Sequence, residues 1–132
     1  MQLAVEVFNF AKHLQSMGVK FVVLCEVLQR FTSTPRIEEK ISCYNSRLQA
    51  ICKAESKIRF WEHRRLRTQI KKSPSSVLRT DGVHLNNQGN YFLYHSIKSS
   101  LRHAMTHVFD DSPCIHDLET EKKRGGRKQM NR

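Results

Sequence analysis

An unbroken apolar run, Phe21–Cys25, constrains the fold of this 132-residue chain more strongly than any other feature of its sequence. Consecutive apolar residues that include β-branched valines are typical of a strand buried on both faces of a parallel sheet. No apolar stretch in the sequence is longer, so none approaches the length of a membrane-spanning helix. We therefore expect an α/β protein that makes no contact with a membrane.

Amphipathic helices are predicted on both sides of this run. Over residues 3–17 apolar side chains recur at three- and four-residue steps, and Gly18 suits the left-handed C-cap of that helix. A second helix is expected from Pro35 to about Glu55, with Thr34 as its N-cap. The apolar stripes of these two helices consist of Leu3, Val7, Phe10, Ala11 and Leu14, and of Ile37, Ile41, Tyr44, Leu48, Ile51 and Cys52.

The second half of the chain is predicted to hold one more strand and one more helix. Residues 58–61 have an apolar, a basic and then two apolar side chains, and this short apolar segment is expected to form the strand. Residues 62–76 are polar and basic, and we interpret them as a connection that closes on a turn. The last helix is expected from about Asn86 to about His107. Its predicted buried face consists of Phe92, Leu93, Ile97, Leu101, Ala104 and Met105.

The resulting order of helix, strand, helix, strand and helix predicts a βαβ unit with a right-handed crossover and one further helix at each end. The fold class is thus α/β, a partial three-layer α/β/α arrangement with two parallel strands and three main helices. Because the strand at 21–25 is apolar on both faces, a sheet of only two strands leaves an apolar edge unpaired. We therefore expect this chain to be the C-terminal part of a larger sheet, or to pair through that edge with another chain.

Positive charge is concentrated in two segments. The chain has 23 Lys and Arg residues against 12 Asp and Glu residues, which gives a formal net charge of +11. Residues 57–79 hold much of this excess, and a second basic stretch lies in residues 110–132, which we expect to form a disordered tail. Such a density of charge attracts nucleic acid through counterion release. The alternative, which we favour slightly, is a solvated surface that keeps the domain soluble.

The cysteine and histidine spacings predict neither a metal site nor a cofactor. His103 and His107 are four residues apart on the last predicted helix, but no third ligand accompanies them, so we expect solvated histidines. If Met1 is the true start of the protein, an intracellular and reducing location is expected. No two cysteines form a C-x-x-C pair, and all four are expected to be reduced thiols. They are Cys25, Cys43, Cys52 and Cys114.

The segment that carries chemistry is Arg79–Gly89, which precedes the last predicted helix. Asp81 and His84 are three residues apart, and Gly82 lets the chain bend so that the carboxylate folds back toward the imidazole. A carboxylate that accepts from one ring nitrogen fixes the tautomer and leaves the other nitrogen as a proton acceptor. Asp81 and His84 are therefore the candidate catalytic residues, an orienting acid and a general base.

This segment, with Asp81, His84, Asn86 and Gly89 directly before an amphipathic helix, resembles the last conserved block of the SGNH (GDSL-type) hydrolase superfamily, with transposon-associated SGNH-like domains as the nearest variety. The resemblance implies that residues 1–109 are the C-terminal portion of a flavodoxin-like SGNH domain. It also implies that His84, oriented by Asp81, deprotonates a serine that attacks an ester. The family's nucleophile and oxyanion blocks have no counterpart in this sequence, so the expected esterase-type domain is incomplete and inactive alone.

Each of these residues also has a structural interpretation. Asp81 and His84 are alternatively a turn-forming residue and a hydrogen-bonded histidine. Asn86 is more simply the N-cap of the last helix, and Gly89 lets that helix pack closely on a neighbouring strand. At the level of function, the alternative is a basic nucleic-acid-binding module of a mobile-element protein, without catalysis. Whether the chain is an enzyme stays open at this point.

Overall fold

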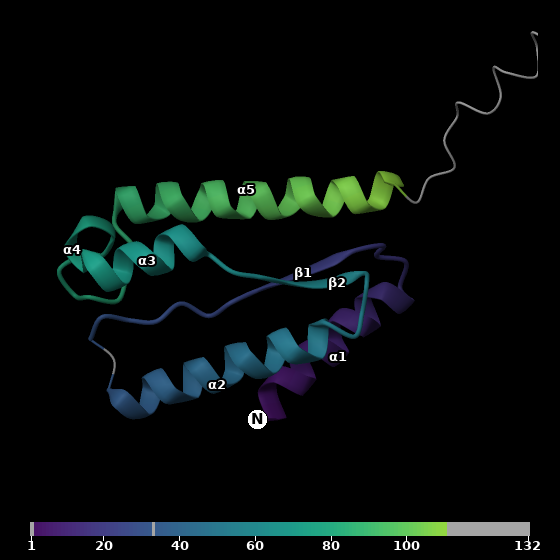
Figure 1. Ribbon diagram of the computed structural model, residues 1–132, viewed down its shortest axis with the longest axis horizontal. Helices are drawn as coiled ribbons and strands as arrows, with labels where there is room; N and C mark the ends of the chain where they lie inside the picture. Colours follow the sequence, from purple (N-terminus) through teal and green to yellow (C-terminus); the bar gives the residue numbers. More distant parts are fainter. Residues whose placement is uncertain (1, 33, 111–132) are drawn as a thin grey trace, which may run out of the picture.

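The computed structural model describes residues 2–32 and 34–110, which form five helices and a two-stranded parallel sheet arranged in three layers (Figure 1). α1 (Gln2–Ser16) and α2 (Pro35–Cys52) cover one face of the sheet, and α5 (Asn87–Asp110) covers the other. The predicted α/β class with two parallel strands is therefore confirmed. In the part of the chain described, no helix has both the length and the apolar character needed to cross a membrane.

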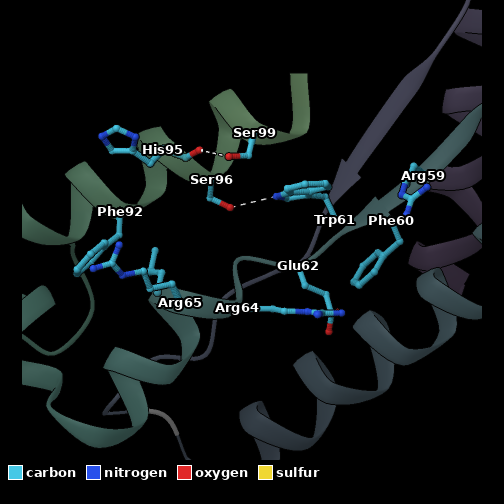
Figure 2. Close-up of a pocket in the computed structure, with 11 residues that line it drawn as sticks. Arg59, Phe60, Trp61, Glu62, Arg64, Arg65, Phe92, His95, Ser96 and Ser99 are labelled. Atoms are coloured by element: carbon cyan, nitrogen blue, oxygen red, sulfur yellow. Dashed lines mark hydrogen bonds and ion pairs between the residues drawn. The ribbon is translucent and has the colours of Figure 1, made fainter. Parts of the chain in front are cut away.

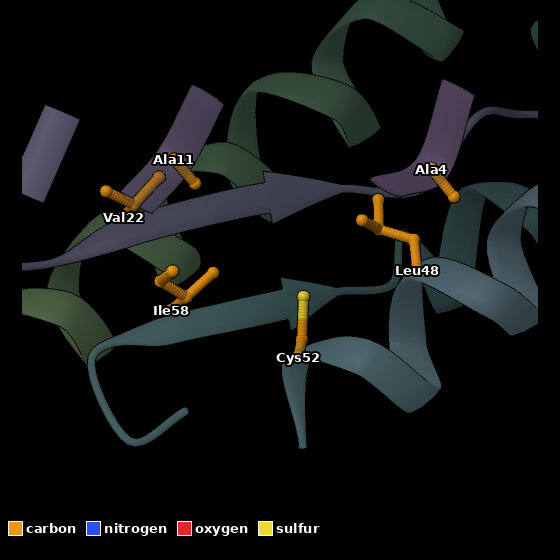
Figure 3. Close-up of a cluster of buried hydrophobic side chains, with 6 residues drawn as sticks. All are labelled: Ala4, Ala11, Val22, Leu48, Cys52 and Ile58. Atoms are coloured by element: carbon orange, nitrogen blue, oxygen red, sulfur yellow. The ribbon is translucent and has the colours of Figure 1, made fainter. Parts of the chain in front are cut away.

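The sheet consists of β1 (Val22–Cys25) and β2 (Ile58–Trp61), and α2 forms the connection between them. Val22 is paired with Ile58, and the register continues to the pair of Cys25 and Trp61. Because side chains alternate between the faces of a strand, Val22 and Ile58 both point toward α1 and α2. There they meet Leu48 in the principal hydrophobic core (Figure 3).

The predicted apolar stripe of α1 is only partly correct. Ala11 and Val7 contact the core as expected, but Leu3 and Phe10 are exposed, and Ala4 is buried instead. The helix is thus rotated so that its smallest side chains lie against the sheet. This orientation leaves two large apolar side chains, Leu3 and Phe10, more than half exposed.

The second helix follows its prediction more closely. The Thr34 side chain accepts a hydrogen bond from the backbone amide of Ile37, which confirms Thr34 as the N-cap, and Pro35 opens the helix. Leu48 and Cys52 are buried, whereas Ile37, in the first turn, is exposed. α2 ends at Cys52, slightly before the predicted end, because residues 53 and 54 form a turn.

A short basic helix, α3 (Arg64–Lys72), and the single turn α4 (Pro74–Val77) occupy the segment that was predicted to be a polar connection, so that prediction was wrong. Leu66 and Ile70 are four residues apart on α3, and they pack with Val77 in a second core cluster. Two apolar positions among basic residues are too few to show helical periodicity in the sequence. Only the tertiary contact with α4 and α5 defines this helix.

The start of α5 is capped as expected. Asn86 Oδ1 accepts from the backbone amide of Gly89 at 2.9 Å, which confirms Asn86 as the N-cap. Gly89 does allow a close approach, but to α4 rather than to a strand. A Cβ atom at Gly89 would lie 2.2 Å from the carbonyl oxygen of Val77. The expected contact with a strand is therefore corrected to a contact with α4.

The buried face of α5 differs from the prediction. Ser100 is almost completely buried, and Ser96 contacts the indole of Trp61, so a polar side of the helix covers the sheet. Phe92 and Leu93 are half-buried against the second core cluster. Three residues predicted to be buried are exposed instead, and they follow one another along the helix at four-residue steps: Ile97, Leu101 and Met105.

Two further expectations concern the chain ends and the thiols. The basic tail expected over residues 110–132 lies outside the described residues, apart from Asp110, at which α5 ends. Three of the cysteines are free thiols, as predicted, and burial raises the pKa of the Cys52 thiol. Cys114 lies outside the described residues.

Candidate functional site

A tight loop between α4 and α5 presents the two candidate catalytic residues. Leu78 and Leu85 form an antiparallel bridge at its base, and the Arg79 amide donates to the His84 carbonyl at 2.7 Å. The Gly82 amide donates to the Arg79 carbonyl at 2.9 Å, which closes a β-turn within the loop. The conformation of this loop is thus fixed by its own backbone hydrogen bonds.

The structure brings Asp81 and His84 into direct contact. Asp81 Oδ2 lies 2.5 Å from Nδ1 of His84, and Asp81 Oδ1 accepts from the backbone amides of Val83 at 2.9 Å and His84 at 3.0 Å. These hydrogen bonds, foremost the one from the His84 ring, hold the pKa of Asp81 well below its ordinary value. Because an ionised carboxylate only accepts, Nδ1 of His84 is the donor in this contact. In the neutral form of a ring protonated at Nδ1, the second nitrogen, Nε2, is a proton acceptor.

Gly82 and the chain that follows β1 hold the loop in place. Gly82 has a φ of +68°, and a Cβ atom there would lie 2.6 Å from Thr32 Cγ2, so both conformation and space require glycine. The Phe31 amide donates to the Gly82 carbonyl at 3.1 Å. Asn45 of α2 fixes the same connecting chain, because its side chain accepts from the Val27 amide at 2.9 Å and donates to the Val27 carbonyl at 2.8 Å.

The loop lies beyond the carboxyl end of the sheet, where the chain leaving β1 and the start of α5 meet (Figure 1). The side chain of His84 is 72% exposed and that of Asp81 45% exposed. Among residues 2–32 and 34–110, no serine is hydrogen-bonded to His84, and Nε2 has no hydrogen-bond partner. The pair therefore presents an open proton acceptor to solvent, without a nucleophile beside it in this part of the chain.

The sequence interpretation missed a buried polar network that joins both strands to α3 and α5. Glu26, at the end of β1, accepts from the backbone amide of His63 at 2.6 Å and from Arg67 at 2.9 Å. His63 Nδ1 lies 2.7 Å from Ser96 Oγ, which also accepts from the Trp61 indole at 3.1 Å. Burial lowers the pKa of His63 and so favours the neutral form of its ring. All five groups have partners, which is typical of a structural network.

The one signal for this network in the sequence is Glu26 itself. An acidic residue directly after an apolar strand predicts a partner nearby, because an isolated buried carboxylate is strongly unfavourable. The partners, His63 and Arg67, lie far along the chain, so no local pattern links them to Glu26.

A cavity of about 530 Å³ opens along the outer side of β2, between α3 and α5 (Figure 2). The guanidinium of Arg65 stacks over the Phe92 ring at 4.5 Å, and Arg64 pairs with Glu62 at 3.0 Å. We name this cavity the basic cleft. Neither Asp81 nor His84 lines it. Its cationic and aromatic side chains are Arg59, Arg64, Arg65, Phe60, Trp61 and Phe92.

The pair of histidines on α5 is packed rather than solvated, which corrects the prediction. Nε2 of His103 lies 3.0 Å from Nε2 of His107, and Phe21 stacks on the His107 ring. Burial, together with the charge of Arg59, lowers the pKa of His103. Across the described residues, no three side chains of the His, Cys, Asp or Glu types come together in a way that would hold a metal ion.

No protein-family model matches this chain, and neither a curated protein nor a solved structure matches it. Its function is therefore inferred from two local arrangements. One is the contact between Asp81 and His84 at the carboxyl edge of the sheet. The other is the basic cleft, where arginines of β2 and α3 line the same cavity as aromatic rings that the sequence interpretation did not associate with them.

Proposed function

We propose that this chain carries the acid–base half of an SGNH-type hydrolytic centre, in which Asp81 orients His84 and His84 accepts a proton. The observation that supports this proposal is the 2.5 Å contact between Asp81 Oδ2 and His84 Nδ1. Its position adds support, because ligands of open α/β sheets bind beyond the carboxyl ends of the strands. The substrate class that follows from the resemblance is a carboxylic ester.

The proposed step is a proton transfer coupled to acyl transfer. A hydroxyl nucleophile attacks the ester carbonyl while its proton passes to Nε2 of His84, and the Asp81 carboxylate stabilises the resulting imidazolium. The proton then moves from Nε2 to the leaving alkoxide, which departs as an alcohol. The nucleophile comes from another polypeptide segment, since no described serine contacts His84. Loss of a nucleophile costs several orders of magnitude in rate, so the chain alone is expected to be inactive.

Nitrogen-15 NMR of the histidine rings tests the proposed role of the pair. In the wild-type chain above the titration range, His84 is expected to be protonated on Nδ1, and Asp81→Ala is expected to abolish that preference. The exposed His13, which has no carboxylate partner among the described residues, serves as an internal reference that stays unchanged. A His84 ring protonated on Nε2 in the wild-type chain would contradict the proposal.

An ester-hydrolysis assay tests the expected incompleteness. With p-nitrophenyl acetate, the purified chain and its His84→Ala variant are expected to give the same rate as buffer. Turnover that depends on His84 would show that the chain supplies its own nucleophile. That result would overturn the proposed division of the site between two polypeptide segments.

The basic cleft supports a second candidate function, the binding of single-stranded nucleic acid. Arg59 and Arg65 are exposed cations that line the same cavity as the half-buried rings of Phe60 and Trp61. Cationic side chains that contact the backbone and aromatic rings that stack on bases are the two elements of sequence-tolerant single-strand binding. Glu62 is the acidic residue among the lining side chains, and it is already paired with Arg64 and Arg67.

Fluorescence anisotropy with a labelled oligothymidine tests this second function. The affinity is expected to fall steeply as the salt concentration rises, because counterions are released on binding. Replacement of Arg59 and Arg65 together by Gln is expected to weaken binding far more than replacement of Arg36 and Lys40, two exposed cations on α2. Equal losses from the two pairs would mean that binding follows net charge alone and would exclude the cleft as the site.

A further inference from the structure

The two edges of the sheet are built differently. The β2 edge is lined by the basic cleft on one side and by a second cavity of about 320 Å³ on the other, and Arg59 is exposed along it. Charged side chains on an edge strand are a common protection against strand pairing. The β1 edge has no such charged side chain on Val22–Cys25.

The backbone of β1 presents free hydrogen-bonding groups on its outer side. The amides of Val22 and Glu26 donate to β2, to the carbonyls of Lys57 and Trp61 respectively. Because alternate residues of a parallel pair point toward the same partner, the amide and carbonyl groups of Val23 and Cys25 point away from β2. In the part of the chain that the structure describes, nothing is hydrogen-bonded to these outward groups.

α1 covers one side of the β1 edge. Lys12 forms an ion pair with Glu55 beyond the end of α2, so this side of α1 faces α2. Ala11 is buried against the sheet, and Phe10, one residue earlier, is rotated by about 100° to the flank that faces away from α2. Helices pack about 10 Å apart while strands lie about 4.8 Å apart, so two helices side by side on two strands extend past the strands. α1 therefore projects beyond β1.

The other side of the β1 edge is bordered by α5. Ser100 is buried toward the sheet, whereas Ser99 lines the basic cleft on the β2 side. Leu101 is rotated about 100° from Ser100 in the direction opposite to Ser99, so it lies on the β1 side. Ile97 and Met105 share this flank of α5. The flank is thus an exposed apolar strip next to the outward backbone groups of β1.

We propose that the β1 edge, between the outer flanks of α1 and α5, binds an extended polypeptide strand whose side chains are apolar on both faces. The strand pairs with the outward groups of Val23 and Cys25. One row of its side chains packs against the α1 flank, and the other packs against the α5 flank. We name this surface the β1 slot. Its apolar lining consists of Leu3, Phe10, Met17, Ile97, Leu101 and Met105.

The chemistry and the size of the β1 slot specify its occupant. None of these lining side chains is charged, although the chain as a whole has a net charge of +11, so charge does not attract the partner. A strand covered by helices on both faces needs a continuous apolar sequence, whereas a strand with one solvent-exposed face has alternating apolar and polar residues. The six side chains are 41% to 69% exposed. Covering them buries an area approaching the ~800 Å² per partner of a standard specific interface.

A designed peptide tests this proposal, which does not depend on the proposed hydrolytic role. The probe is a labelled peptide of five valine and isoleucine residues flanked by glutamates, and the control peptide of equal charge has proline at its centre. The full chain is expected to bind the first peptide and not the second, because proline cannot pair as an interior strand. Phe10→Asp and Leu101→Asp are each expected to weaken binding by about tenfold or more. Ile37→Asp, at an exposed site on α2, is expected to leave it unchanged.

Amide hydrogen exchange in the same samples locates the bound strand. The amides of Val23 and Cys25 are expected to become protected on binding. The outward amides of Ile58 and Phe60 on β2 are expected to exchange as before, which distinguishes the two edges. Equal binding of both peptides, protection at β2 in place of β1, or no binding of the apolar peptide would each overturn the proposal. Unchanged circular dichroism of the two aspartate variants establishes that these exposed positions leave the fold intact.

Discussion

Replacement of Gly89 by alanine tests the packing that holds the candidate site against α4. A Cβ atom at this position would lie 2.2 Å from the Val77 carbonyl oxygen, whereas an ordinary contact lies at 3.4–4 Å, so the two backbones must separate. Overpacking of this kind costs about 1–3 kcal/mol. The hydrogen bond from the Asn86 amide to the same carbonyl, 2.9 Å long, adds about 1 kcal/mol when it is lost. Alanine gains about 1 kcal/mol over glycine within a helix. The net expectation is a destabilisation of about 2 kcal/mol.

Urea unfolding followed by circular dichroism measures this change. Asn90→Ala, at the exposed neighbouring position of the same helical turn, is the matched control and is expected to be neutral or slightly stabilising. The sign of the change in stability shows whether Gly89 is in close contact with α4, because replacing an unconstrained helical glycine by alanine stabilises a protein. A Gly89→Ala chain as stable as the wild type, or more stable, would refute the close contact between α5 and α4.

Three further predictions concern the core, the loop and the pH dependence. Leu48→Ala is expected to lower the free energy of unfolding by about 2–5 kcal/mol in urea denaturation, since Leu48 is fully buried. Gly82→Ala is expected to cost about 1–2 kcal/mol from its φ of +68° and to weaken the Asp81–His84 contact, visible as a shift of the His84 ring nitrogens. Burial lowers the pKa of His63 in the folded chain below its ordinary value of 6.5. As the pH falls below 6.5, His63 therefore takes up a proton in the unfolded chain before it does so in the folded chain. Stability is thus expected to fall from pH 7 to pH 5, with a shallower slope in His63→Asn, and an identical slope would contradict this account.

The candidate site was largely accessible from the sequence because its geometry is local. Asp81 and His84 are three residues apart, and the glycine between them adopts the left-handed conformation that brings the carboxylate to the ring. Asn86 caps α5 through a hydrogen bond that also spans three residues. Such contacts depend on backbone turns whose residue preferences are strong. The catalytic role of the pair is our proposal.

The elements that the sequence interpretation missed depend on contacts between distant residues. The helix α3 has only Leu66 and Ile70 as buried positions, and their partners come from α4 and α5. The pairing of Glu26 with His63 and Arg67 spans 37 and 41 positions. The rotation of α5 also escaped prediction, because helical periodicity identifies an apolar stripe but does not say whether another element covers it.

Local patterns in the sequence thus determined the two strands, the three long helices, the parallel α/β class, the N-caps of α2 and α5, and the Asp81–His84 turn. Each of these rests on residues within a few positions of one another, where backbone preferences and helical or strand periodicity act directly. The tertiary structure alone decided which faces of α1 and α5 meet the sheet, how the charge of Glu26 is satisfied, and where the basic cleft lies. Those outcomes depend on which surfaces of distant segments fit together. The best-fitting arrangement is selected only when all the helices and strands pack at once.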